Sequence, residues 1–163
     1  EKWFEKDNLK HIFSNDVCCE IHGDLTIENI IGERAVERTF YFIDPNTGNL
    51  HESKALDYAK LLQSLHGGYE FLMAVSNYEI KGNEIRFFAT RSMIYEQIYK
   101  KFDSYLRSIM TPEEVRSVYF HEVIHFLRLL PYKIQKDGKK AGVFYAQMII
   151  ILHDILEMFG GEQ

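Results

Sequence analysis

The sequence predicts one mainly helical α+β domain over residues 1–163. Apolar residues recur at helical spacing through most of the second half of the chain. Two pairs of short stretches rich in β-branched and aromatic residues are joined by turn residues, which is typical of β-hairpins. A hydrophobic content of 46% over 163 residues is enough to bury one sizeable core, so a second domain is not required.

The N-terminal part of the chain is predicted to end in a hairpin. The elements that precede this hairpin are a helix over 1–13, a strand over 17–21 and a tight loop over 22–26. A strand from Asn29 to Ile31 and a polar turn opened by Gly32 follow, and the segment 39–43 returns antiparallel because it is β-branched and aromatic. This return places Asp44 beside Asn29.

Helices dominate the rest of the predicted fold. They cover 54–66, 92–110, 112 to about 130 and 141–159, and a second hairpin covers 78–87 around Gly82-Asn83. Thr111, Pro112 and Glu114 carry the N-cap, first-turn proline and capping-box pattern of the third helix. We expect Gly67-Gly68, Pro131 and Gly160-Gly161 to end the helices that precede them.

The segment 22–29 has the spacing H-G-D-x-x-x-x-N, and an apolar strand ends nearby at Ile43-Asp44. Such a match arises by chance in roughly one in a thousand chains of this length. Mg²⁺ prefers oxygen ligands and usually takes only one or two from protein, so Asn29 and Asp44 are candidate magnesium ligands. Asp24 lies in the same loop, where its carboxylate could orient an attacking hydroxyl and accept its proton. Each residue taken singly is also a common turn residue.

These motifs resemble the catalytic half of the aminoglycoside phosphotransferase and choline kinase-like family, which has a protein-kinase-like fold. The resemblance implies a C-terminal kinase-like lobe in which short β-hairpins carry the catalytic loop and the metal-binding Asp. It implies that Asp24 is the catalytic base, that Asn29 and Asp44 hold Mg²⁺ against ATP or another nucleoside triphosphate, and that His22 braces the loop. The segment 56–59, Leu-Asp-Tyr-Ala, is similar to the helix start that follows the metal Asp in this family, and its Asp is expected to cap or brace.

Two features narrow the expected activity to a small-molecule phosphotransferase. Gly23 stands where protein kinases have Arg, and only about a dozen residues separate Asp44 from Asp57, which leaves no room for a phosphorylated activation segment. The expected acceptor is therefore a sugar, an amino alcohol or an aminocyclitol. The chain contains no G-x-G-x-x-G, so we expect the N-terminal nucleotide-clamping lobe to be a missing partner and this fragment to transfer phosphate poorly alone.

The segment 61–71 is similar to segments of kinase-like domains that are encoded with bacterial surface-polysaccharide and sugar-nucleotide enzymes. In that interpretation Tyr69, Glu70 and Phe71 help to line the acceptor side. The alternative interpretation makes them core aromatic residues and a solvated glutamate.

A rival motif, H-E-x-x-H, lies at His121, Glu122 and His125 on a predicted helix. This spacing sets two imidazoles one turn apart for zinc and leaves the glutamate to activate water, as in a zinc metallohydrolase. On a helical wheel both histidines share a side with Ser117, opposite an apolar arc, so they are expected on a polar face. A third hypothesis is a non-catalytic kinase-like binding module.

Composition and charge limit the possible partners. A net charge of −5 argues against nucleic acid, and the basic segment 133–140 is predicted to be a solvated loop. Cys18 and Cys19 are adjacent in a predicted strand, an arrangement unsuited to a structural disulfide, which favours a reducing cytoplasm. The longest apolar stretch, in 141–159, is interrupted by polar residues and is too short to span a bilayer, so no membrane association is expected.

Overall fold

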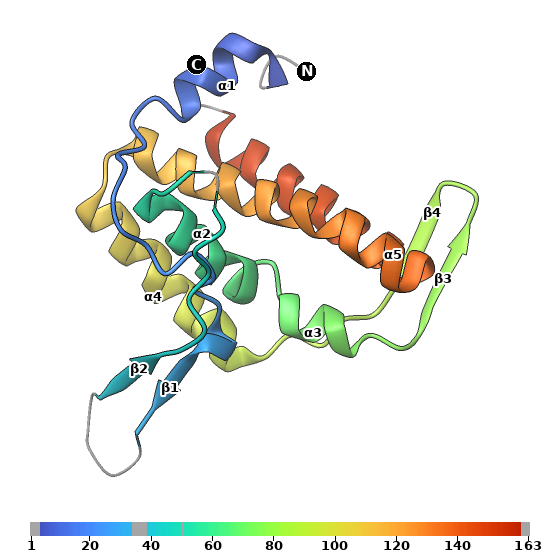
Figure 1. Ribbon diagram of the computed structural model, residues 1–163. Coiled ribbons are helices and arrows are strands. Elements are labelled where there is room, and N and C mark those ends of the chain that lie inside the picture. The colour runs from blue at the N-terminus through green and yellow to red at the C-terminus, as the bar shows by residue number, and fades with distance from the viewer. Residues whose placement is uncertain (1–3, 34–38, 50, 161–163) are drawn as a thin grey trace.

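The computed structural model describes residues 4–33, 39–49 and 51–160 and has a mainly helical α+β fold, as predicted (Figure 1). The elements in chain order are α1 (Lys6–Ile12), the 3₁₀ turn η2 (Ile27–Asn29), β1 (Ile30–Gly32), β2 (Phe40–Phe42), α2 (Lys54–Leu65), α3 (Tyr69–Ala74), β3 (Tyr78–Lys81), β4 (Glu84–Phe87), α4 (Met93–Ile109) and α5 (Pro112–Phe159). The strands form two separate antiparallel pairs, β1 with β2 and β3 with β4. These hairpins extend from opposite ends of the helical body (Figure 1).

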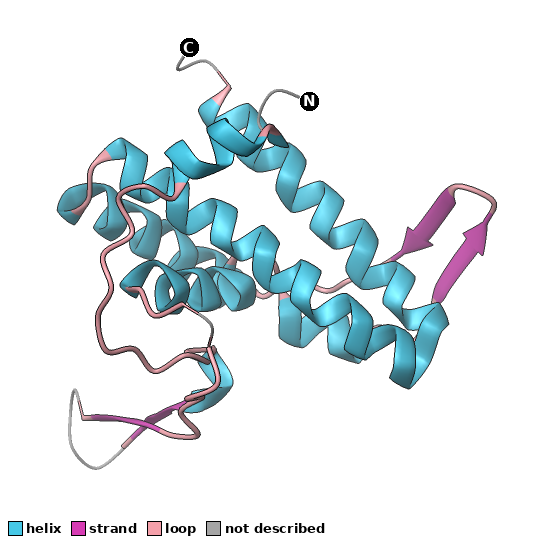
Figure 2. Cartoon of the chain, turned by 45° about the horizontal axis from the view of Figure 1, so that its top comes forward, coloured by secondary structure: helices cyan, strands magenta, loops and turns pink. Residues whose placement is uncertain are grey.

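The long helix α5 is bent into two arms that run antiparallel (Figure 2). The break lies at Asp137, whose φ of −156° and ψ of 91° are not helical. The Asp137 side chain accepts a 3.0 Å hydrogen bond from the backbone N–H of Lys140, so it caps the start of the second arm. Helices α1, α2 and α4 all contact this bent helix.

The hydrophobic core lies where α2 packs against both arms of α5. Its largest fully buried side chains are Leu62, Leu72, Leu106, Val115, Tyr119, Phe126, Phe144, Ile151, Ile155 and Phe159. Close packing also explains Gly67 at the end of α2, because a Cβ there would lie 2.6 Å from the Phe126 ring.

A buried polar contact joins α2 to α5 within this core. His66 and Glu122 are 8% and 0% exposed, and His66 Nδ1 lies 2.9 Å from Glu122 Oε2. The imidazole also stacks on the Tyr99 ring with 5.0 Å between centroids. Its Nε2 lies 3.7 Å from Asp154 on the second arm of α5, so one histidine connects three helical segments.

Several predicted elements are confirmed. Helix α2 ends at Leu65, just before the predicted stop at Gly67-Gly68, where Gly68 has a φ of 65°. Helix α4 begins after Ser92, whose side chain accepts a hydrogen bond from the Ile94 N–H. Thr111 and Glu114 form the predicted capping box. The second hairpin pairs Tyr78 with Phe87 around a two-residue turn.

Three predictions about the ends of elements were wrong. The segment 17–21 is not a strand, because it makes only one isolated bridge, between Cys18 and Ser53, and no neighbouring strand extends the ladder. Asn29 belongs to η2, and β1 starts one residue later. Pro131 does not end a helix, since α5 continues to Asp137; packing of this arm against α2 outweighs the cost of a helical proline.

Two further predictions were wrong in whole or in part. Most of the basic segment 133–140 is exposed, as predicted, but it is helical on both sides of Asp137 and not a loop. Lys133 in the basic segment is buried, with its ammonium 4.5 Å from the centroid of the Phe144 ring, and burial lowers its pKa. His121, His125 and Ser117 are buried at the contact of α5 with α1, α2 and the preceding loop, where a two-faced helical wheel does not apply because both sides of the helix are covered. The predicted helix over 1–13 begins at Lys6, and residues 1–3 and Gly161 lie outside the described residues.

By length and composition α5 could cross a membrane, a test that the core helix of a soluble protein also passes. Much of this helix contributes buried side chains to the core described above. Other apolar residues of the same helix, Ile149 and Ile150 among them, are 43% exposed and lie outside this core.

The His66–Glu122 pair predicts a pH-dependent stability. Burial alone would lower the pKa of His66, but the Glu122 carboxylate outweighs it and the net pKa is raised. The charged imidazole therefore stabilises the fold fully below about pH 6.5, and this contribution is lost as pH rises through the raised pKa. Glu122→Gln should lower the free energy of unfolding by about 3 kcal/mol at low pH and by less at high pH.

Urea unfolding of both proteins between about pH 5.5 and pH 9 measures this difference. The control is Glu113→Gln, which removes an exposed carboxylate from the first turn of the same helix. An effect of Glu122→Gln that does not change with pH would contradict the assignment.

Candidate functional site

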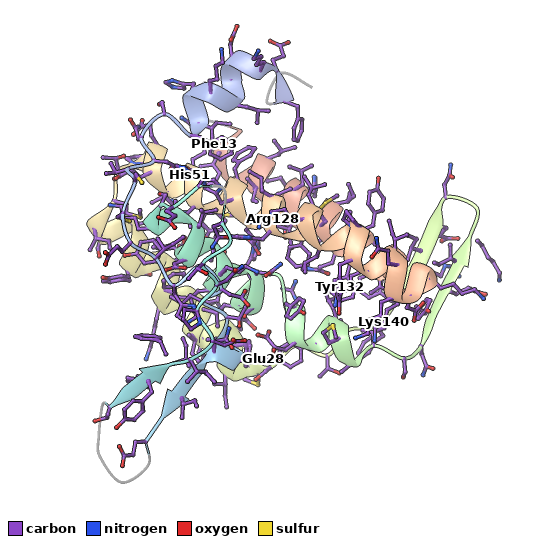
Figure 3. The ribbon with its side chains drawn as sticks, viewed as in Figure 1. Phe13, Glu28, His51, Arg128, Tyr132 and Lys140 are labelled. Atoms are coloured by element: carbon purple, nitrogen blue, oxygen red, sulfur yellow. The ribbon has the colours of Figure 1, made fainter. Side chains whose placement is uncertain are left out.

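Asp24, Asn29 and Asp44 line one cavity of about 240 Å³. The structure thus brings together the three residues that the sequence singled out. The cavity is completed by residues of the loop before β1, of α2, of α3 and of α5: Thr26, Glu28, Lys60, Gln63, Tyr69 and Leu129. The lining residue Glu28 lies at the base of the first hairpin, which shows where the cavity is (Figure 3).

The register of the first hairpin explains how Asn29 and Asp44 meet. Ile30 pairs with Phe42, and the ladder is extended by a 3.1 Å hydrogen bond from the Ile43 N–H to the Asn29 carbonyl. Asp44 follows directly and has a φ of 57°, in the left-handed region that a residue with a side chain rarely adopts. Backbone strain of this kind is concentrated at functional sites.

The loop that carries Asp24 is attached to α2 by Asp57. One carboxylate oxygen of Asp57 accepts a 2.7 Å hydrogen bond from the His22 N–H, and the other accepts a 2.8 Å bond from the Gly23 N–H. The sequence prediction that Asp57 caps or braces is confirmed as bracing, because the N-cap of α2 is Ser53. Gly23 has a φ of 80°, and a Cβ there would lie 2.2 Å from the Asn46 carbonyl oxygen, so only glycine fits.

The His22 ring ties the same loop to the end of β2. Its Nε2 lies 2.9 Å from the Ile43 carbonyl oxygen, and its backbone carbonyl accepts a 2.8 Å bond from the Asn46 N–H. His22 is not among the residues that line the cavity. The geometry is therefore that of a loop-bracing residue, as the sequence predicted.

Asn29 and Asp44 present oxygen atoms that suit a hard cation. The Asn29 Nδ2 donates a 2.8 Å hydrogen bond to the Asp24 carbonyl, which leaves the amide oxygen for a ligand. The Asp44 side chain is exposed and has no hydrogen-bond or ion-pair partner among the described residues. One amide oxygen and one carboxylate match the small number of protein ligands that Mg²⁺ takes.

Lys60 is the residue that sequence reasoning missed. Its Nζ lies 2.9 Å from Asp24 Oδ1 and 3.2 Å from Gln63 Oε1, and its side chain is 15% exposed. Lys60 and Gln63 follow Asp57 at intervals of three residues on α2, so they extend the face that holds the loop. Their three-residue spacing from Asp57, on a helix that was predicted correctly, was the sequence signal that could have placed Lys60 at the site.

Of the three residues predicted for the acceptor side, only Tyr69 lines the cavity. Burial raises its pKa, and the negative charges of Glu28 and Asp24 add to the effect, so the phenol stays protonated and can donate a hydrogen bond. Glu70 instead accepts a 2.6 Å hydrogen bond from Ser64, whose hydroxyl accepts the Ile27 N–H. Phe71 contacts Tyr95 away from this cavity.

The three residues of the H-E-x-x-H motif bind three different partners. His121 Nε2 lies 2.6 Å from Asp16 Oδ2, Glu122 pairs with His66, and His125 Nε2 lies 3.1 Å from the Leu56 carbonyl. Burial lowers the pKa of His125 to about 3. Over the described residues, no three or more His, Cys, Asp or Glu side chains form a group that could hold a metal ion.

Comparison of the chain with protein-family models, with curated proteins and with solved structures finds no match.

Removing the Asp57 carboxylate tests whether the loop depends on it. Asp57→Ala leaves two adjacent N–H groups without a protein acceptor, so we expect a loss of about 2 kcal/mol in the free energy of unfolding. Amide hydrogen exchange over residues 22–24 should accelerate by about tenfold or more. The control Asp7→Ala removes an acid that is 95% exposed and should change neither quantity. Unchanged exchange in Asp57→Ala would show that the loop is held by other contacts.

Proposed function

We propose that this chain is the catalytic lobe of a kinase-like phosphotransferase that moves a phosphoryl group from ATP, or another nucleoside triphosphate, to a hydroxyl of a small molecule. The observation that carries the proposal is the shared cavity of Asp24, Asn29 and Asp44. The spacing of these residues in the sequence is specific, and two of them lie on strands or turns that other side chains fix in place. A binding module has no need of such a set.

Each residue has a distinct role in this proposal. Asp24 orients the acceptor hydroxyl and takes its proton as the oxygen attacks phosphorus. Asn29 and Asp44 hold Mg²⁺, which would neutralise charge on the nucleotide phosphates when bound. His22 and Asp57 keep the loop rigid, so that Asp24 does not need to be ordered during the reaction.

The proposed partner is an N-terminal lobe that clamps the nucleotide. The outer faces of β1 and β2 carry large exposed apolar side chains next to the cavity, with Phe40 and Phe42 both 61% exposed. An exposed apolar patch of this kind marks an interaction surface. A covering lobe would bury these rings and close the nucleotide side of the site.

Free, exposed Cys18 and Cys19 fit the proposed cytoplasmic location.

Calorimetric titration of the chain with Mg-ATP tests the metal site. We expect weak binding that requires Mg²⁺ and that weakens by about tenfold or more in Asp44→Ala, because the nucleotide loses a metal-mediated contact. Asp24→Ala should retain binding. The control Glu52→Ala makes the same change in net charge at an exposed residue outside the cavity and should bind as the unmodified chain does.

Two results would contradict the proposed function. Stoichiometric zinc in the purified chain, lost in His121→Ala, would support the metallohydrolase instead. An absence of any Mg²⁺-dependent nucleotide binding would support a non-catalytic module.

A transfer assay tests the role of Asp24. In a protein that joins this domain to its nucleotide-clamping lobe, Asp24→Ala should lower kcat by at least about a hundredfold, since the proton acceptor is lost while the nucleotide still binds. Unchanged turnover in this variant would rule out the mechanism. Glu52→Ala again serves as the control for net charge.

A further inference from the structure

A second cavity of about 160 Å³ adjoins the site and shares Lys60 and Leu129 with the first cavity. Its other lining residues come from the loop on either side of the first hairpin and from the first arm of α5: Gly23, Asn46, Asn49, His125 and Arg128. Lys60 therefore lies between the two cavities and lines both of them.

The two cavities have opposite charge. Of the residues that the structure describes, the first is lined by the carboxylates Asp24, Glu28 and Asp44 and by one cation, Lys60. Among the described residues, the second is lined by Lys60 and Arg128 and by no carboxylate. A metal-bound nucleotide suits the acidic cavity, because the cation faces the acids, whereas the basic cavity suits a negatively charged group.

Both cations have donor capacity left for a ligand. The Lys60 ammonium has three N–H donors, of which Asp24 and Gln63 account for two. The exposed Arg128 guanidinium, on the first arm of α5 (Figure 3), has no ion-pair partner among the described residues. A planar guanidinium binds phosphate or carboxylate groups through two parallel hydrogen bonds.

The second cavity also contains hydrogen-bonding groups that are neutral. His125 is uncharged because burial lowers its pKa, and its Nε2 donates to the Leu56 carbonyl, so Nδ1 is an acceptor. The amide of Asn49 adds polar atoms at the same wall, where its Nδ2 lies 3.0 Å from the Asn46 carbonyl oxygen. An imidazole acceptor and amide groups suit hydroxyl groups of a ligand.

We propose that the acceptor is a hydroxylated compound that carries a phosphate or carboxylate group, and that Lys60 and Arg128 bind this group in the second cavity. This inference rests on the proposed function. It excludes amino alcohols and aminocyclitols as the natural acceptors, because their ammonium groups would face two cations at close range. Among the acceptor classes predicted from the sequence, it selects the sugars and restricts them to acidic ones.

The acceptor oxygen forms a bond to the γ-phosphorus, and its proton moves to Asp24. The bond from that phosphorus to the bridging oxygen breaks, and its electron pair leaves on the nucleoside diphosphate. Lys60, released from its carboxylate partner when Asp24 becomes neutral, keeps its charge for the anionic acceptor.

Binding of three probes to the whole chain tests this inference without requiring turnover. The probes are glycerol 3-phosphate as the hydroxylated anion, glycerol as its neutral counterpart and 2-deoxystreptamine as the aminocyclitol. We expect glycerol 3-phosphate to bind tightest, with an affinity that falls as salt rises. Arg128→Gln should weaken its binding by about tenfold, and Lys60→Met by at least as much.

Matched variants separate binding from folding. Arg128→Lys keeps the charge and should recover part of the lost affinity. Lys54→Met removes a cation from the same helix as Lys60, but Lys54 pairs with Glu114 outside both cavities and its removal should leave the affinity unchanged. Arg128 is exposed, so its substitution does not threaten the core.

Different results would contradict the anionic acceptor and the phosphotransferase activity. If Mg-ATP binds as proposed but Arg128→Gln leaves glycerol 3-phosphate binding unchanged, or if 2-deoxystreptamine binds tightest, the anionic acceptor is wrong and the phosphotransferase survives. If glycerol 3-phosphate binding depends on Arg128 while no nucleotide binds, the anion site stands and the proposed reaction fails.

Discussion

The carboxylate of Asp57 holds the loop of the site against the helical body. It accepts the two consecutive N–H groups of His22 and Gly23, and it lies on α2, which packs against α5. The His22 ring then fixes the end of β2, and the hairpin register fixes Asn29 next to Ile43. A chain of short contacts thus transmits the rigidity of a packed core to three polar side chains that would otherwise lie on mobile turns.

Buried acid and imidazole groups link the helices elsewhere in the fold. Asp16 accepts hydrogen bonds from Ser117 and His121 over more than a hundred residues of sequence, and Glu122 faces His66. Burial opposes ionisation of Asp16, but the bonds from His121 and Ser117 outweigh it and lower its pKa. A motif that resembles a metal site by spacing therefore serves here as a set of contacts between segments that are distant in the sequence.

The parts of the fold that could be predicted depend on local chemistry. The capping box at Thr111, the turn at Gly82-Asn83 and the end of α2 just before Gly67-Gly68 are set by residues within one turn of each other. The conformation of the segment 17–21 depends on its single bridge to Ser53, and the burial of His121 depends on its contact with Asp16. Both partners are distant in the sequence, so neither feature could be predicted from nearby residues. At the site, the sequence indicated the three polar residues by their spacing, but Lys60 reaches Asp24 only through tertiary structure.

Because α5 folds back at Asp137, side chains from late in the chain complete the core. The second arm supplies Phe144, Ile151, Ile155 and Phe159 to the same core as Leu62 of α2. During translation the earlier helices emerge without these partners, and their apolar faces remain uncovered until residues 138–159 have left the ribosome. Until that arm is in place the apolar faces of the earlier helices stay exposed, and exposed apolar surface of this kind favours aggregation.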